Sequence, residues 1–192
     1  MTTKKRVVRF IVQLIAIGVL IGLDQLIKRA VELRLKGAGT KVLIKGVLGL
    51  RYAENTGAAF SLFNSSTAAL SVVTAVAMLA GLVALFVIKK KALIYEITVP
   101  LIIAGGAGNL IDRLTRGYVI DYIMTLFVNF PIFNFADCLI TCSCIAIMIW
   151  LIYEIVRDSK PKPAGDAPAE AAPAAGPDGA PAENDRDGEA HA

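Results

Sequence analysis

The sequence predicts an all-α integral membrane protein with four transmembrane helices, and with a small β element and interfacial segments on its outer face. Two observations predict this class. The chain of 192 residues is 56% hydrophobic with a mean hydropathy of +0.63, which is too apolar for an ordinary soluble domain. The apolar residues also form long runs bounded by charged residues. Runs of about 20 apolar residues are long enough to cross a hydrocarbon core of about 30 Å.

The first predicted helix covers about residues 10–27. It follows a basic segment, residues 1–9, and its apolar run from Phe10 to Leu23 is interrupted only by Gln13. No small-x-small cleavage site follows this run, and no cysteine is there to accept lipid. We therefore expect an uncleaved anchor rather than a signal peptide.

The next segment, residues 31–66, breaks the apolar pattern with scattered glycines and basic residues. Within it, 42–44 and 47–52 have the composition of short strands. We expect a small β element that lies on the membrane surface.

Three further helices are predicted, at about 68–88, 93–111 and 138–156. The first of them is a clean apolar run of 21 residues that ends at three consecutive lysines. The second contains Pro100 and a cluster of glycines. Four spans would place both termini on the same side of the membrane.

Composition divides the chain into a basic membrane domain, residues 1–160, and an acidic tail, residues 161–192. The domain has 18 Lys and Arg against 9 Asp and Glu, whereas the tail has 2 against 7 and holds six of the eight prolines. The tail has little to bury and is predicted to be disordered. The domain is expected to meet lipid headgroups rather than nucleic acid.

Charge placement also bears on orientation. The termini and the loop between the second and third helices carry ten Lys and Arg near the membrane, against nine on the opposite side. The total does not decide the orientation. The tight clusters that flank the first and second helices favour cytoplasmic termini, because charges close to the spans weigh most.

The histidine content excludes several kinds of enzyme. The only histidine, His191, lies in the tail, so a Ser-His-Asp site, a Cys-His site or a zincin motif has no histidine to use. We expect neither a metal nor a cofactor. The glycine cluster at 105–108 does not fit a nucleotide-binding motif, and we interpret it as close helix packing that positions Asn109. The cysteines, Cys138, Cys142 and Cys144, are interpreted as small buried packing residues.

Polar residues gather near the ends of the predicted helices. Gly105, Asn109 and Arg113 recur at helical spacing and share a face, and Asp112 lies next to that face. For Arg113 and Asp112 alone, a polar cap where the helix leaves the membrane is an equally good explanation. Asp112 is expected to pair with basic neighbours. Asp24 and Lys28 form an i, i+4 pair that, taken alone, is typical of an interfacial ion pair.

Two aspartates stand out chemically. Asp121 lies in a mostly apolar stretch, and Asp137 lies at the start of the fourth predicted helix, where a helix N-cap is the alternative explanation. Two carboxylates about 4 Å apart repel by about 4 kcal/mol at an effective dielectric constant of about 20, so they share one proton near neutral pH. Such a pair can activate water against a peptide carbonyl and protonate the leaving amine.

The order of several motifs resembles the bacterial lipoprotein signal peptidases (signal peptidase II) over roughly residues 7–157. These motifs are Asp24-Gln25-Leu26-Ile27-Lys28, Asn55-Thr56-Gly57-Ala58-Ala59-Phe60, Gly105 to Arg113, Val119-Ile120-Asp121-Tyr122 and Asn134-Phe135-Ala136-Asp137. The resemblance implies a four-helix aspartic endopeptidase of the bacterial inner membrane, with cytoplasmic termini and an active site near the outer face. Its partners would be membrane lipid and prolipoproteins, cut just before a diacylglyceryl-modified cysteine. No oligomer is implied.

By motif, the resemblance implies that Asp121 and Asp137 are the catalytic pair. The positions expected to support the pair or bind substrate are Asn55, Gly105, Asn109, Asp112, Arg113, Asn134, Ala136, Asp24 and Lys28. Tyr122 stands where the family commonly has phenylalanine, and the tail lies outside the pattern.

Three alternatives use the same residues differently. In a small transporter or proton channel the carboxylates would relay ions, although no inverted repeat is visible. In a non-catalytic assembly protein the polar faces would bind partner helices. A Ser–Lys peptidase would use Ser61, Ser65 or Ser66 with a lysine.

Overall fold

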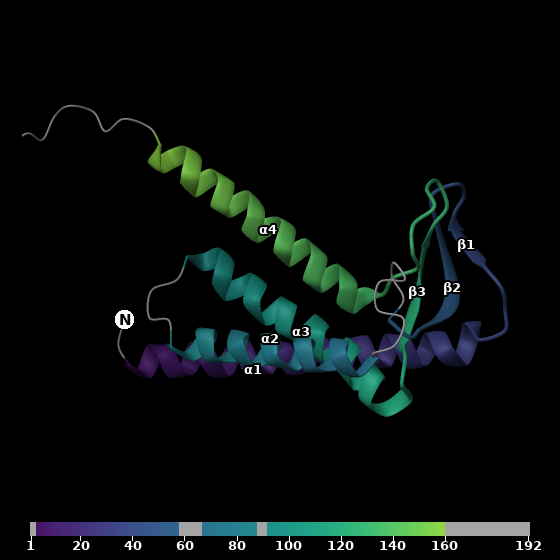
Figure 1. Cartoon of the computed structure of the whole chain (residues 1–192), viewed down its shortest axis with the longest axis horizontal. Helices are drawn as coiled ribbons and strands as arrows, with labels where there is room; N and C mark the ends of the chain where they lie inside the picture. Colours follow the sequence, from purple (N-terminus) through teal and green to yellow (C-terminus); the bar gives the residue numbers. More distant parts are fainter. Residues whose placement is uncertain (1–2, 58–66, 88–91, 160–192) are drawn as a thin grey trace, which may run out of the picture. The chain divides into compact units, whose positions relative to one another are not determined.

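The computed structural model describes residues 3–57, 67–87 and 92–159 (Figure 1). Along these residues the elements are α1 (Thr3–Leu35), β1 (Lys41–Ile44), β2 (Leu48–Asn55), α2 (Thr67–Val87), α3 (Leu93–Arg116), β3 (Val119–Thr125) and α4 (Phe135–Asp158). The described residues up to Asp158 belong to one compact unit. The predicted tail, together with Ser61, Ser65 and Ser66, lies outside the described residues.

The predicted mostly helical membrane fold with a small β element is confirmed. Within the described residues, α1, α3 and α4 are long and apolar enough to cross a membrane, and α2 contributes a shorter apolar segment, 71–86. The predicted bounds were too short for α1, α3 and α4. Helix α1 continues eight residues past its predicted end because Lys28 is buried within the protein and does not mark the membrane surface.

Helix α3 is the one against which the other three helices pack. Its glycines face different neighbours. A Cβ atom on Gly105 would lie 2.5 Å from the carbonyl oxygen of Ala136 in α4, and one on Gly106 would lie 3.3 Å from Met78 of α2. A Cβ on Gly108 would overlap the carboxylate of Asp24 in α1. The absence of side chains therefore lets three helices approach α3 closely, as the packing interpretation predicted.

One apolar core joins α1, α2 and α3. Ile17, Leu85 and Ile103 are buried there together. The Glu96 carboxylate near the start of α3 pairs with Arg9, and the Glu96 carbonyl accepts a hydrogen bond of 3.0 Å from Gln13. The first turns of α3 are thus attached to α1 by polar contacts as well as by apolar packing.

The three strands form an antiparallel sheet in the order β1-β2-β3 (Figure 1). Both strands predicted in 42–52 are present, whereas β3 was not predicted. Residues 119–122 are all buried, so β3 lacks the alternation of polar and apolar residues that indicates a strand. Ile120 and Tyr122 pack with Val31, which attaches the sheet to the end of α1.

The prediction that the cysteines are buried packing residues is wrong. Cys142 and Cys144 are exposed on the protein surface and Cys138 is half-buried. Only Ala136 and Ser143 are buried in α4, so most of this helix presents its side chains outward. In a membrane these side chains would face lipid, where a cysteine is as acceptable as any small apolar residue.

Substituting Gly105 with alanine tests the close approach of α3 and α4. The added methyl group would meet the backbone of Ala136 and the side chain of Ile140, so α4 must move outward. We expect the free energy of unfolding to fall by about 1–3 kcal/mol, measured as a lower Tm in one detergent. Gly22→Ala in α1 is the matched control, because nothing lies within 4 Å of the added carbon. A Gly105→Ala protein as stable as the Gly22→Ala protein would contradict the contact.

Candidate active site

Two carboxylates from separate elements are held by one asparagine. Asp121, in the middle of β3, is only 2% exposed, while Asp137 lies in the first turn of α4 and is half-buried. Asn134 donates its side-chain amide to Asp121 Oδ1 at 2.6 Å and its backbone N–H to Asp137 Oδ2 at 3.0 Å. Asn134 is therefore hydrogen-bonded to both carboxylates of the candidate pair.

The start of α4 fixes the orientation of Asp137. The helix begins at Phe135, so Asn134 is the N-cap and Asp137 is the third helical residue; the alternative of Asp137 as the cap is wrong. Asp137 N–H donates to Asn134 Oδ1 at 3.0 Å, while the Asn134 N–H donates to Asp137 in return. This reciprocal pair is a capping box, which satisfies two backbone donors and leaves Asp137 Oδ1 for another partner.

That partner is Asn109 of α3. Its Nδ2 donates to Asp137 Oδ1 at 2.8 Å, and its Oδ1 accepts from Lys28 Nζ at 2.9 Å and from Asn134 Nδ2 at 3.1 Å. A lysine ammonium can only donate, so Lys28 determines which end of the Asn109 amide carries oxygen. The amide nitrogen is consequently directed at Asp137.

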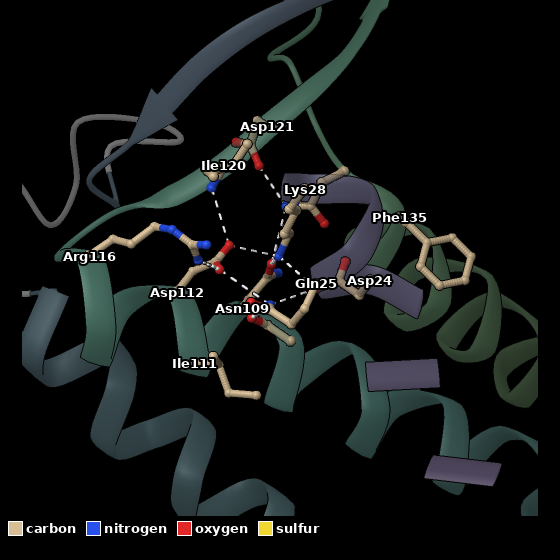
Figure 2. A network of polar contacts seen from close by, with 12 residues as sticks. Asp24, Gln25, Lys28, Asn109, Ile111, Asp112, Arg116, Ile120, Asp121 and Phe135 are labelled. Carbon is tan, nitrogen blue, oxygen red and sulfur yellow. Dashed lines mark hydrogen bonds and ion pairs between the residues drawn. The ribbon is translucent and has the colours of Figure 1, made fainter. Parts of the chain in front are cut away.

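Lys28 is the centre of a buried charge network (Figure 2). Its side chain is 0% exposed, and its three N–H groups meet Asn109 and the carboxylates of Asp24 and Asp112, the latter two at 2.9 Å each. Asp24 and Lys28 are therefore enclosed within the protein, which their spacing taken alone did not indicate. The pair is enclosed because α3 brings a second carboxylate and an amide to the same ammonium.

Asp112 extends this network to the sheet. It pairs with Arg116 at 2.5 Å and with Lys28, as expected for a carboxylate with basic neighbours, and its Oδ2 accepts the backbone N–H of Ile120 at 3.3 Å (Figure 2). Ile120 immediately precedes Asp121. Asp112 thus attaches the strand that carries Asp121 to the end of α3.

Sequence reasoning missed two members of the network, Arg116 and Gln25. Gln25 donates its side-chain amide to the Gly108 carbonyl at 3.1 Å and to Asp112 at 3.3 Å. The available signal was spacing, since Arg116 lies four residues after Asp112 in the same helix. For Gln25 there was no spacing signal towards α3, because its partners in that helix are 83 and 87 residues away.

The other candidate residues divide into two groups. Asn55 donates to Asp121 Oδ2 at 2.8 Å, and the Arg113 guanidinium interacts electrostatically with Asp137, Asp121 and Asp112. Gly105 and Ala136 instead face each other where α3 and α4 pack. Their contribution is the close approach of the two helices that carry Asn109 and Asp137.

Burial raises the pKa of Asp121 to about 6, and the charge of Asp137 acts in the same direction. The amides of Asn55 and Asn134 oppose this shift, because they donate to the ionised carboxylate. A carboxyl whose pKa is raised to about 6, beside a second carboxylate, is suited to acid and base roles in one reaction.

Replacing Lys28 with methionine tests the dependence of the site on the buried charge. The substitution keeps an unbranched side chain one atom shorter than lysine, but leaves Asp24 and Asp112 buried without their shared cation. We expect the free energy of unfolding to fall by about 3–5 kcal/mol, with a large drop in Tm. Lys36→Met, which breaks an exposed pair with Glu54, should change Tm little. Equal Tm values for the two variants would contradict a structural role for the network.

The family model and the similar proteins of known function point to the same family. Residues 16–153 match the family model for signal peptidase (SPase) II. The chain is 36% identical to the lipoprotein signal peptidase of Enterococcus faecalis, covering 79% of this chain and 92% of that protein. It is 38% identical to that of Clostridium tetani, covering 73% and 91%. A solved bacterial membrane enzyme superimposes with a TM-score of 0.70 at 26% identity, covering 80% of this chain and 94% of its own.

Proposed function

Because this chain belongs to the signal peptidase (SPase) II family, we propose that it is a membrane endopeptidase that removes signal peptides from prolipoproteins. Cleavage would fall immediately before the diacylglyceryl-modified cysteine. The observation that carries the catalytic part of this proposal is the joint binding of Asp121 and Asp137 by Asn134. Residues 1–160 would form the peptidase domain, and the 161–192 tail would lie outside it.

The proposed mechanism is aspartic. Asp121, the more buried carboxyl, holds the shared proton, and ionised Asp137 takes a proton from the water that attacks the scissile carbonyl. Asp121 polarises that carbonyl and donates its proton to the developing oxyanion. When the tetrahedral intermediate collapses, Asp137 protonates the leaving amine, and Asp121 recovers its proton from the intermediate. Each proton is returned, so the pair is regenerated without a cofactor.

The charges around the pair support a single shared proton. Lys28 and Arg116 balance the carboxylates of Asp24 and Asp112 within their own network. Arg113 then remains close to the pair, where one positive charge offsets one negative charge. Two ionised aspartates would leave this enclosed region with an excess negative charge, which is costly away from water.

We propose that the pair acts near the outer face of a bacterial cytoplasmic membrane that α1 to α4 all cross, with both termini in the cytoplasm. The pair lies at the end of the helices that also carries the sheet (Figure 1). Asp24 and Lys28, towards the end of the apolar part of α1, are at the same level as Asn109. A cleavage site anchored by acyl chains can reach a carboxylate pair at this level without leaving the membrane.

Substituting either aspartate tests the catalytic pair. Asp121→Asn and Asp137→Asn, each alone, are expected to lower the rate of cleavage of a diacylglyceryl-modified prolipoprotein at least about 100-fold, because each removes an acid or base group. Asp158→Asn, at a carboxylate that is 70% exposed at the end of α4, should cleave like the wild type. Full activity of either dyad variant, with insertion and Tm preserved, would refute the assignment.

The pH dependence tests which carboxyl holds the proton. If Asp121 holds it while Asp137 is ionised, kcat/KM falls as the pH rises past the pKa of Asp121, which is about 6 in the free protein. The Asn55 amide stabilises the ionised form, so Asn55→Ala should move this alkaline limb to higher pH. A uniform loss of rate at every pH, with the limb unmoved, would show that Asn55 acts only on the structure.

A further inference from the structure

A cavity separate from the carboxylate pair lies between the end of α1 and the first two strands. Its volume is about 570 Å³, and it is open on one side. Ile27 and Val31 of α1 and Leu50 of β2 form its apolar wall, while Arg34 and Lys41 contribute the cationic groups. Asp121, Asp137 and Asn134 do not line it.

The two cations in this cavity differ from their neighbours. Arg29 pairs with Glu32 and Lys36 pairs with Glu54, each at about 3 Å. Arg34 and Lys41 form no ion pair with any of the residues that the structure describes, and no carboxylate is among the residues that line the cavity. The cavity thus has two positive charges available for an anion.

The apolar wall belongs to the side of α1 that packs against the sheet. Ile27, Val31 and Leu35 follow one another along one side of the helix, over about 12 Å at 1.5 Å per residue. The cations lie at the end of this wall next to the sheet. An occupant that fits must therefore have a long apolar part and an anionic end.

The surface beside the cavity is apolar as well. β1 is the edge strand of the sheet, and its residues Val42, Leu43 and Ile44, with Val47 in the turn that follows, are each at least 45% exposed. A hydrophobic edge strand facing water favours aggregation, whereas one that contacts a bilayer does not. Lys41, which also lines the cavity, immediately precedes these residues and places a cation where the apolar edge would meet anionic headgroups.

We propose that this cavity binds an anionic phospholipid of the surrounding bilayer. The phosphate of the headgroup lies between Arg34 and Lys41, with the Thr40 hydroxyl beside it, and one acyl chain follows Ile27 and Val31 along α1. The site is separate from the proposed catalytic pair, and the proposal does not depend on the peptidase activity. Its occupant is a lipid that holds the sheet against the membrane.

Lipid binding to the purified full-length protein in detergent tests the proposal. Native mass spectrometry would compare phosphatidylglycerol with phosphatidylcholine of the same acyl chains. The wild type should retain phosphatidylglycerol at least about tenfold better. The double variant Arg34→Gln/Lys41→Gln should bind phosphatidylglycerol about thirtyfold more weakly, since each basic residue near an anionic headgroup contributes about 1 kcal/mol.

Two further variants separate the cavity from general surface charge. Ala30→Phe, at an exposed position that lines the cavity, should fill it and weaken phosphatidylglycerol binding with every charge kept. Lys45→Gln/Arg51→Gln removes two exposed cations outside the cavity and should bind like the wild type. Asp121→Asn should also bind like the wild type, which keeps this test apart from that of the peptidase.

Three outcomes would overturn the lipid site. The first is wild-type binding by the Arg34→Gln/Lys41→Gln protein. The second is an equal loss of binding in the Lys45→Gln/Arg51→Gln control, which would assign the effect to diffuse charge. The third is displacement of phosphatidylglycerol by an equal concentration of inorganic phosphate, which would show that the cavity takes a free anion and uses no acyl chain.

Discussion

The enclosed ammonium group of Lys28 is the constraint on which the site depends. Removing a charge from water costs several kcal/mol, and the protein offsets this only if every N–H group finds an acceptor in good geometry. Here the three acceptors come from Asp24 in its own helix and from Asp112 and Asn109 in α3. Helices α1 and α3 can therefore slide or rotate against each other only by breaking these contacts. Because the two helices are fixed in position relative to each other, the side-chain amide of Asn109 has one orientation.

The glycines of α3 and this charge network are parts of one arrangement. The aspartate side chain is short, so Asp24 can share the Lys28 ammonium with Asp112 of α3 only if the backbones of α1 and α3 approach closely. Gly108 provides that approach, and Gly105 provides the matching approach of α4, whose first turn carries Asp137. Small residues in membrane helices usually serve packing alone. In this protein the packing also sets the distance at which the polar side chains meet.

The sequence was sufficient for those features that depend on local pattern. Apolar runs located the helices found within 3–57, 67–87 and 92–159, and linked motifs identified the polar residues that Asn134 and Lys28 bring together. It was insufficient where the deciding contact is distant along the chain. The spacing of Asp24 and Lys28 taken alone indicated only an interfacial ion pair, because Asn109, a partner that helps to bury Lys28, is 81 residues away. Strand β3 was missed because both of its faces are covered at 119–122, which removes the alternation that would reveal a strand.

The direction of the hydrogen bonds around Asn109 and Asn134 has an evolutionary consequence. Lys28 only donates, both oxygens of Asp137 accept, and the two amides between them have their donors and acceptors fixed accordingly. Replacing one amide by a carboxylate would set two acceptors against each other, and replacing one carboxylate by an amide would oppose two donors. Single exchanges among these residues are therefore strongly disfavoured, and divergence would require simultaneous changes at two or more positions. Substitutions in the site are therefore expected to occur together, whereas the outward-facing side chains of α4 can be substituted one at a time.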